Sequence, residues 1–332
     1  MEKNTGLQDG ALDRVIKAML AMQRYPWEQG VCAQALYEAG RDDLWIPMAH
    51  DAVKRMDREG RLAMAGGGEE VSDPAANGEV CLRAFEKTGD LFFINGAKRM
   101  LEYLLNDAPR TADGVICHNN TSFFEGFSKY QLWIDGMYMV PPFLAVMGEL
   151  DEAYSQIKGY VRHLFDDEND LFYHIVDVSD GRFVRKVHWA TGNGWAVMGL
   201  ARVIEEADGK GRKDIASELT ALLIRVISAM HRHQPADGRF TDILDGDDSF
   251  TDGTSSMMFA AAVYRGIVHG YVPEEFGQYA ENAYGAVTND IDEYGILRHV
   301  AGCPDFISDG TSAEAQASYI MASARREIYL KG

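Results

Sequence analysis

Carboxylate, indole and imidazole side chains gather in a few short segments of this 332-residue chain, each next to a glycine. The plainest five are Trp27-Glu28-Gln29-Gly30, Ala76-Asn77-Gly78, Ile134-Asp135-Gly136, Gly192-Asn193-Gly194 and Thr251-Asp252-Gly253. Four of the five tryptophans lie in or beside these segments, Trp45 being the exception. Positioned carboxyl and imidazole groups can transfer protons, and indole rings stack on the faces of sugars. The segments therefore predict acid–base chemistry in a sugar-binding cleft.

The same segments recur at regular intervals along the chain. Their glycines are 48 to 59 residues apart, and one further step ends near Ser312-Ala313-Glu314, so we count six repeats. Between the glycines the apolar residues follow helical spacing, most clearly in one stripe over residues 212–230. Similar amphipathic segments cover residues 11–22, 44–56, 92–105, 150–165 and 274–288. Segments directly after the glycines are apolar nearly all round, which is typical of buried helices.

Six amphipathic helices that alternate with six buried ones predict an all-α fold, an (α/α)6 barrel that occupies residues 1–332 as a single domain. Every link from an outer to an inner helix then emerges at the same end, where we expect a concave site. Proline is tolerated only in the first turn of a helix, so Pro141-Pro142 predict that the third inner helix begins near Val140. Residues 171–188 predict a small β-hairpin around Asp180-Gly181.

Charge and composition exclude several classes of partner. With 51 acidic and 32 basic residues the net charge is −19, so we expect no nucleic-acid partner. No apolar run approaches the ~20 residues of a membrane span, and the first ten residues show no leader-like pattern. We expect a cytoplasmic protein with no membrane partner. The four cysteines have no zinc-like spacing, so we expect reduced thiols and neither a metal nor an organic cofactor. The sequence carries no signal for an oligomeric state.

Aspartates directly before helices have a simpler explanation than catalysis. Asp135, Asp252 and Asp309, taken singly, are more typical of N-caps. The convergence of carboxylates, indoles and histidines at one mouth favours a site. Burial beside Trp133 and a nearby carboxyl such as Asp73 would raise the pKa of Asp135, whereas a helix N-terminus would lower it. Methionines are more typical of core packing than of ligand binding.

The motifs resemble the unsaturated rhamnogalacturonyl hydrolases of glycoside hydrolase family 105, and more distantly the unsaturated glucuronyl hydrolases of family 88. The most specific motif is Gln-Leu-Trp-Ile-Asp-Gly-Met-Tyr-Met at 131–139, followed by Pro-Phe-Leu-Ala at 142–145. Supporting motifs lie at 171–174, 189–195, 252–259 and 310–317, so the resemblance spans nearly the whole chain.

The resemblance implies roles for particular residues. Asp135 matches the family's catalytic aspartate, and we take Asp73 as a second candidate catalytic residue. The candidate substrate-binding residues, from the family's pocket positions, its main motif and the mouth segments, are Trp133, His118, His174, Met139, Trp189, Trp195, His188, Asp252 and Trp27.

Two departures from the family pattern are visible. The loop 119–126, after His118, is longer than usual in the family. Thr191 stands where the family commonly has an arginine between the two tryptophans. Threonine cannot replace a bidentate cationic contact. The alternative partners for a substrate carboxylate are Arg24, Lys129, Arg298 and His299.

The implied substrate is an oligosaccharide that a polysaccharide lyase has left with a 4,5-unsaturated uronic acid at its non-reducing end, with a rhamnogalacturonan type, as in pectin degradation, favoured. In this hypothesis protonated Asp135 delivers a proton to C4, and water then adds at C5. Two alternatives remain open. A sugar 2-epimerase or aldose-ketose isomerase of the same fold would use a histidine pair such as His174 and His188. A non-catalytic oligosaccharide-binding protein would keep the tryptophans.

Overall fold

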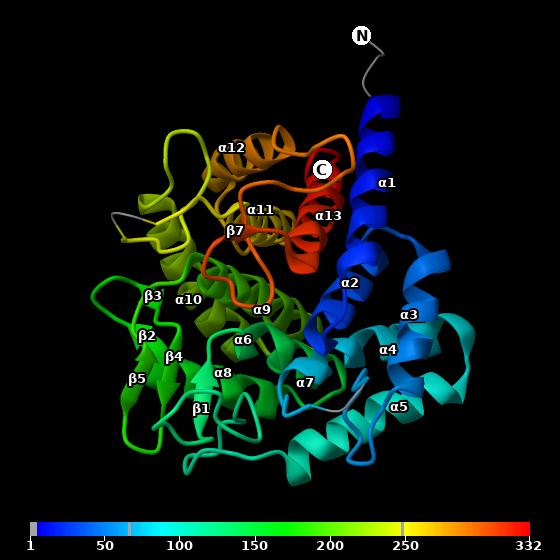
Figure 1. Cartoon of the computed structure of the whole chain (residues 1–332), viewed down its shortest axis with the longest axis vertical. Coiled ribbons are helices and arrows are strands. Elements are labelled where there is room, and N and C mark those ends of the chain that lie inside the picture. Colours follow the sequence, from blue (N-terminus) through cyan, green and yellow to red (C-terminus); the bar gives the residue numbers. More distant parts are fainter. Residues whose placement is uncertain (1–4, 66–67, 247–248) are drawn as a thin grey trace.

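Inner and outer helices alternate in the computed structural model, which describes residues 5–65, 68–246 and 249–332. The outer helices are α1 (Thr5–Met22), α3 (Asp42–Lys54), α5 (Leu91–Glu102), α8 (Leu150–Leu164), α10 (Lys213–Arg232) and α12 (Gly277–Thr288). The inner helices are α2 (Pro26–Glu38), α4 (Ala76–Thr88), the pair α6 (Gly136–Met139) and α7 (Pro141–Val146), α9 (Ala190–Gly209), α11 (Gly253–Val268) and α13 (Ala313–Tyr329). Each inner helix contacts the next and α13 contacts α2, so the ring closes (Figure 1). The predicted (α/α)6 barrel is confirmed.

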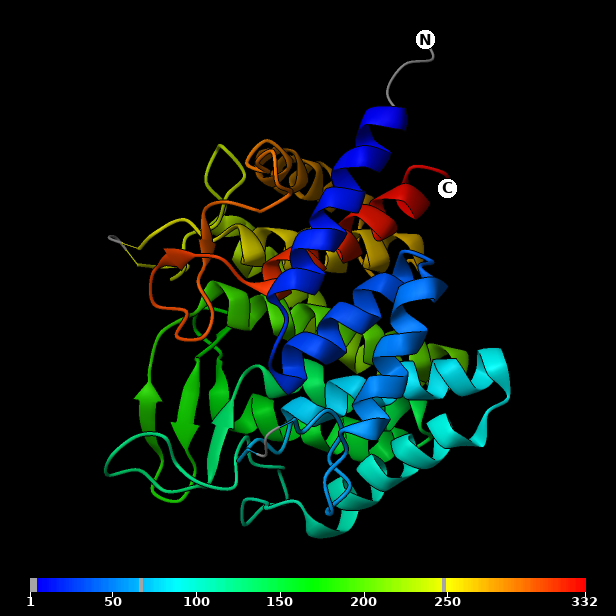
Figure 2. The same ribbon diagram turned by 45° about the vertical axis from the view of Figure 1, so that its right-hand side comes forward.

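Short elements complete the links between the helices. Two are 3-10 turns, at Asp73–Ala75 and Glu274–Phe276, and the segment Tyr103–Asp107 is a π-helical extension of α5. The first and last helices, α1 and α13, pack against each other, which brings the two ends of the chain to one side of the barrel (Figure 2). Within the described ranges, no helix has both the length and the apolar character needed to cross a membrane.

Burial separates the two rings of helices as the hydrophobic pattern predicts. In α11, every residue from Gly253 to Gly266 is buried, because neighbouring helices surround it. In α10, the buried residues form a stripe along one face that includes Ile215, Leu219 and Val226. The polar face of α10 therefore covers the outside of the barrel.

The repeated glycines allow the inner helices to approach one another closely. A Cβ atom on Gly30 of α2 would lie 2.6 Å from the Ala76 backbone of α4. One on Gly78 of α4 would lie 2.2 Å from the Phe143 ring of α7, and one on Gly194 of α9 would lie 2.8 Å from Met258 of α11. These distances leave no room for a side chain, so glycine is required where successive inner helices meet.

The third inner helix begins earlier than its prolines predict. The short helix α6 already starts at Gly136, and the Val140 amide donates to the Gly136 carbonyl oxygen at 3.2 Å. Pro141 has no N–H and ends α6, but it suits the first position of a new helix, α7. The predicted helix start near Val140 is confirmed for α7, but the sequence did not predict the short helix α6 that precedes it.

Three small antiparallel sheets interrupt the helices. The predicted hairpin is confirmed as β4 (Ile175–Asp177) and β5 (Arg182–Arg185), with Gly181 in the left-handed region at φ +73°. The strand β1 (Gln131–Trp133) pairs with β4 on its other side and places Trp133 opposite Ile175. The remaining strands pair as β2 (Phe165–Asp166) with β3 (Leu171–Phe172), and β6 (Val300–Ala301) with β7 (Asp309–Gly310).

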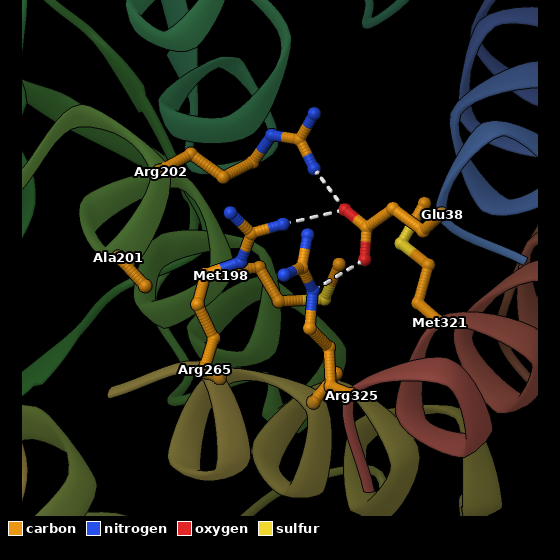
Figure 3. A pocket seen from close by; sticks show the side chains of 9 residues that line it. Glu38, Met198, Ala201, Arg202, Arg265, Met321 and Arg325 are labelled. Atoms are coloured by element: carbon orange, nitrogen blue, oxygen red, sulfur yellow. Dashed lines mark hydrogen bonds and ion pairs between the residues drawn. The ribbon is translucent and has the colours of Figure 1, made fainter. Parts of the chain in front are cut away.

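A buried ionic cluster joins the inner helices at the end of the barrel opposite the links. Glu38 lies at the end of α2 and accepts hydrogen bonds from Arg202 of α9, Arg265 of α11 and Arg325 of α13 at 2.7, 2.5 and 2.7 Å (Figure 3). Burial alone would raise the pKa of Glu38, but the three guanidinium groups hold it well below its usual range. Arg202 also pairs with the buried Glu79 of α4. The cluster therefore connects five inner helices: Glu38 joins α2 to α9, α11 and α13, and Arg202 joins α9 to α4.

Candidate active site

A cavity of about 650 Å³ lies at the end of the barrel where the links emerge. Its wall combines the starts of inner helices, the sheet β1-β4-β5, and the loops around residues 119–124 and 304–307. The candidate residues that line it are Trp27, Asp73, His118, Trp133, Asp135, Met139, His174, Trp189 and Trp195.

Asp135 is a partly buried acid without a capping role, and its side chain is 18% exposed. It directly precedes α6, yet its side chain accepts no hydrogen bond from the first turn of that helix. Its Oδ2 atom is buried without a hydrogen-bond partner, and the nearest basic atom, Nε2 of His174, lies 3.9 Å away. The pKa of Asp135 is raised to about 6, mainly by burial and also by Asp73, while His118 and Arg185 oppose the shift. Desolvation therefore outweighs the effects that favour the anion.

Asp73 is a second buried acid in the same cavity. It opens the 3-10 turn before α4 and accepts a hydrogen bond from the Ser72 hydroxyl at 3.2 Å. Burial, with a smaller contribution from Glu70, raises the pKa of Asp73 to about 7. The cavity therefore contains two carboxyl groups that keep their protons well above the usual range of aspartate.

His118 is fixed in the wall despite the long loop that follows it. Its amide donates to the Gln131 carbonyl oxygen at 3.0 Å, and its own carbonyl oxygen accepts from the amides of Val71 and Ser72. Its Nδ1 atom lies 2.8 Å from the Ser72 hydroxyl. Burial lowers the pKa of His118 to about 4, so the ring is neutral at neutral pH. The loop that follows contributes Phe123, which lines the cavity and is 60% exposed.

Aromatic rings form a continuous surface around Asp135. The His118 and Trp133 rings stack at 4.5 Å, and Trp133 meets His174 edge-on at 6.0 Å. His174 in turn stacks on Trp189 at 4.3 Å. Flat rings at these positions provide apolar faces for a sugar and exclude water from the acid between them.

Arg185 is a cavity residue that the sequence did not identify. It stands on β5, and its Nη1 and Nη2 atoms lie 3.1 Å from His174 Nδ1 and 3.3 Å from Asp242 Oδ2. A guanidinium can only donate, so Nδ1 of His174 must accept and its proton must sit on Nε2, the atom nearest Asp135. The hairpin motif included Arg185, but the pairing of β1 with β4, which brings β5 to the cavity, carried no signal in the sequence.

The cations that the sequence suggested for a substrate carboxylate lie elsewhere. Arg24, Lys129, Arg298 and His299 do not line the cavity. Arg298, for example, pairs with Asp292 on the surface. Thr191 is fully buried and donates to Asp252.

Two of the candidate binding residues face away from the cavity. The Nδ1 atom of His188 lies 2.7 Å from Asp245 Oδ2, and its ring stacks on Tyr173 at 4.6 Å. Asp252 caps α11 by accepting from the Thr254 amide at 3.0 Å, and it also accepts from the Ala301 amide at 3.1 Å. Both side chains are committed to packing behind the cavity wall, so the structure does not bring them to a ligand.

The described residues include no cluster of three or more histidine, cysteine, aspartate or glutamate side chains placed to hold a metal ion. Further lining residues that the sequence did not predict for the site are Tyr25, Glu70, Asn119, Phe124, Asp305, Phe306 and Ile307. Most belong to loops far apart in the chain, and only the closed ring brings them together.

A helical barrel with one acidic, tryptophan-lined mouth has the form of a carbohydrate-active enzyme. The family model described as Glycosyl Hydrolase Family 88 matches residues 7–325, and the chain belongs to this family. The resemblance seen in the sequence motifs is confirmed, and the chain is a glycosyl hydrolase.

Individual relatives are distant in sequence and close in fold. The unsaturated rhamnogalacturonyl hydrolase YesR of Bacillus subtilis is 23% identical over 301 residues, which cover 87% of this chain and 83% of YesR. A possible member of family GH105 from Salmonella enterica superimposes with a TM-score of 0.83 at 19% identity, covering 96% of this chain and 93% of that one. An unsaturated glucuronyl hydrolase specific for heparin gives a TM-score of 0.73 at 16% identity, with coverages of 97% and 96%.

Proposed function

We propose that this glycosyl hydrolase removes a 4,5-unsaturated uronic acid from the non-reducing end of oligosaccharides that polysaccharide lyases produce. The observation that carries the proposal is the carboxyl of Asp135, which lines the cavity, whose buried Oδ2 has no partner in the protein and whose pKa is raised to about 6. Relatives that carry the names of unsaturated rhamnogalacturonyl and unsaturated glucuronyl hydrolases support the substrate class. We favour a rhamnogalacturonan-type substrate on the likeness to YesR.

In this mechanism Asp135 acts first as an acid and then as a base. The protonated carboxyl gives its proton to C4, the electrons of the C4=C5 bond form the new C–H bond, and positive charge develops on C5 and the ring oxygen. A water molecule then bonds to C5 and returns a proton to the Asp135 carboxylate. The resulting hemiketal at C5 opens, so C5 becomes a ketone and the ring oxygen becomes a hydroxyl group on C1. C1 is then a hemiacetal carbon, and it releases the rest of the oligosaccharide as an alcohol and becomes an aldehyde. This route differs from glycosidases that cleave the glycosidic bond directly with two carboxylates.

Neighbouring residues support these steps. The Nε2–H of His174, 3.9 Å from Asp135 Oδ2, faces the oxygen on which negative charge appears after proton transfer. Arg185 is the one lysine or arginine among the described lining residues, so we assign it to the uronate carboxylate. Asp73 lies 3.9 Å from His118, which stacks on Trp133, and these two residues can hold a ring hydroxyl or the attacking water.

The structure disfavours the epimerase alternative. That reaction needs two groups that exchange protons with one sugar, and His174 and His188 were the candidates. His188 is directed to Asp245 and Asp166 behind the wall, so the pair does not meet in the cavity.

The test follows the ultraviolet absorbance of the conjugated C4=C5 bond while the protein acts on unsaturated disaccharides from rhamnogalacturonan and from glycosaminoglycans. We expect the wild type to remove the absorbance and Asp135→Asn to lower kcat by ~10²–10⁴-fold, the usual contribution of general acid–base catalysis. Asp309→Asn is the matched control, since Asp309 lies in β7 outside the cavity lining. Persistence of the absorbance on every substrate would overturn the proposal and favour a binding protein.

A further inference from the structure

Glu314 is a buried acid in the cavity that the proposed reaction does not use. It lies in the first turn of α13, is only 3% exposed, and lines the cavity. Its Oε1 atom is buried and has no hydrogen-bond partner in the protein. This oxygen is therefore left for a ligand.

The groups that face Glu314 from the neighbouring elements are mostly acidic. Asp135 precedes α6, Glu28 lies in the first turn of α2, and Asp252 precedes α11. The thiols of Cys32 and Cys303 are also close enough to Glu314 that its charge raises their pKa values. Burial, and then these three carboxyl groups, raise the pKa of Glu314 well above its ordinary value, against a smaller lowering effect of Trp27. A carboxylic acid that keeps its proton is a hydrogen-bond donor.

Arg185 and Glu314 line the cavity from different parts of the fold. Arg185 stands on β5, in the sheet at the left of Figure 1, and Glu314 stands on α13 in the inner ring. A uronate ring whose C5 carboxylate meets Arg185 carries its C2 and C3 hydroxyl groups on the opposite edge. A neutral donor suits that edge, because an ionised Glu314 would add a further negative charge to a cavity that must accept an anion.

We propose that Glu314 is a specificity-determining residue that donates a hydrogen bond from its carboxyl group to the C2–C3 hydroxyl edge of the unsaturated uronic acid. The inference rests on the proposed function for its substrate class. With this hydrogen bond the enzyme recognises three features of the sugar: the carboxylate, the double bond and the C2–C3 hydroxyl edge.

The experiment is a double-mutant-type cycle in which both Glu314 and the hydroxyl groups of the substrate are changed. The parent unsaturated disaccharide is compared with its 2-deoxy and 3-deoxy analogues in the wild type, Glu314→Ala and Glu314→Gln, by KM and kcat from the loss of ultraviolet absorbance. A neutral hydrogen bond is worth roughly three- to tenfold, so the wild type should favour the parent over one deoxy analogue by that factor, in KM and not in kcat. Glu314→Ala should lose this preference and Glu314→Gln, which keeps a neutral donor, should retain it. Glu327→Gln, an exposed position on the same helix, is the control.

Equal preference for the parent in the wild type and in Glu314→Ala would overturn the inference, as would loss of the preference in Glu314→Gln. The same cycle is measured by calorimetric binding in an Asp135→Asn background. A wild type that turns over no unsaturated disaccharide refutes the proposed function alone, since the binding cycle still shows whether Glu314 recognises the hydroxyl edge.

Discussion

Replacement of Asp135 by Asn should stabilise the protein at alkaline pH while it removes activity. The pKa of this carboxyl is raised from 3.8 to about 6 in the folded protein, so the folded state holds the proton more tightly than the unfolded chain. Below both values the group is protonated in both states and has no effect on stability. As the pH rises through this window, the unfolded chain releases its proton first, and the free energy of unfolding falls. Above about 6 the loss is complete.

The size of the effect follows from the pKa values. Each tenfold difference in proton affinity is worth about 1.4 kcal/mol, so the loss from this carboxyl is about 3 kcal/mol. For 332 residues the entropy of unfolding is about 0.7 kcal/mol per kelvin, which converts the loss into about 4 °C in Tm. Asparagine is neutral at every pH and nearly isosteric with the protonated acid, so the Asp135→Asn protein does not lose this free energy of unfolding as the pH rises. Scanning calorimetry should give similar Tm values for both proteins near pH 4 and a higher Tm for Asp135→Asn near pH 8.

A carboxylate of opposite behaviour provides the control. Burial is the largest single effect on Asp113 and raises its pKa, but the hydrogen bonds from Thr111, His163 and Arg162 together outweigh it and hold the pKa well below the usual range. Asp113→Asn should therefore lower the Tm near pH 8. If Asp135→Asn changed the Tm equally at both pH values, or lowered it near pH 8, the explanation by burial of the acid would be refuted.

Two further predictions concern charged groups at the two ends of the barrel. Arg185→Gln should lower kcat/KM by ~10–150-fold, because a hydrogen bond to a charged group is lost. Since Arg185 lowers the pKa of Asp135, its removal should move the alkaline limb of the pH–rate profile to higher pH, and a limb that stays in place would contradict this. Glu38→Gln leaves three buried guanidinium groups without their shared carboxylate and should cost about 3–5 kcal/mol, seen as a Tm lower by about 4–7 °C. An unchanged Tm, as expected for exposed Glu327→Gln, would show that the cluster contributes nothing to stability.

The helical ring could be predicted from the sequence because the glycine and the apolar pattern that define each pair of helices lie within a single repeat. Gly30, Gly78 and Gly194 mark the close approaches of inner helices, and the apolar stripe of α10 follows from helical geometry. The strand β1 was not predictable, since its three residues gain their pairing only from β4, more than forty residues later. Short strands of this kind depend on tertiary contacts and not on local preference.

The site was predictable where the motif itself contributes the side chain. Trp133, Asp135 and Met139 belong to one motif and all reach the cavity. Side chains in the links can point into the cavity or pack behind its wall, and the sequence does not show which of the two they do. His188 turns to Asp245, and Asp252 accepts a hydrogen bond from the Ala301 amide of β6, so neither lines the cavity. Arg185 and Glu314 reach the cavity because of sheet pairing and ring closure, which are properties of the whole chain.

The ionic cluster at the far end has a consequence for the order in which the protein matures during synthesis. Glu38 leaves the ribosome early, and Arg325 follows 287 residues later. Contacts across such a separation form late, after the loop between them has been ordered. The opposite end has the same dependence, since Trp27 comes from the first repeat and Glu314 from the last. Nascent chains that stop short of α13 therefore lack both the closing ion pair and the part of the cavity wall that Glu314 forms, and we expect substrate to bind fully only after the final helix has docked.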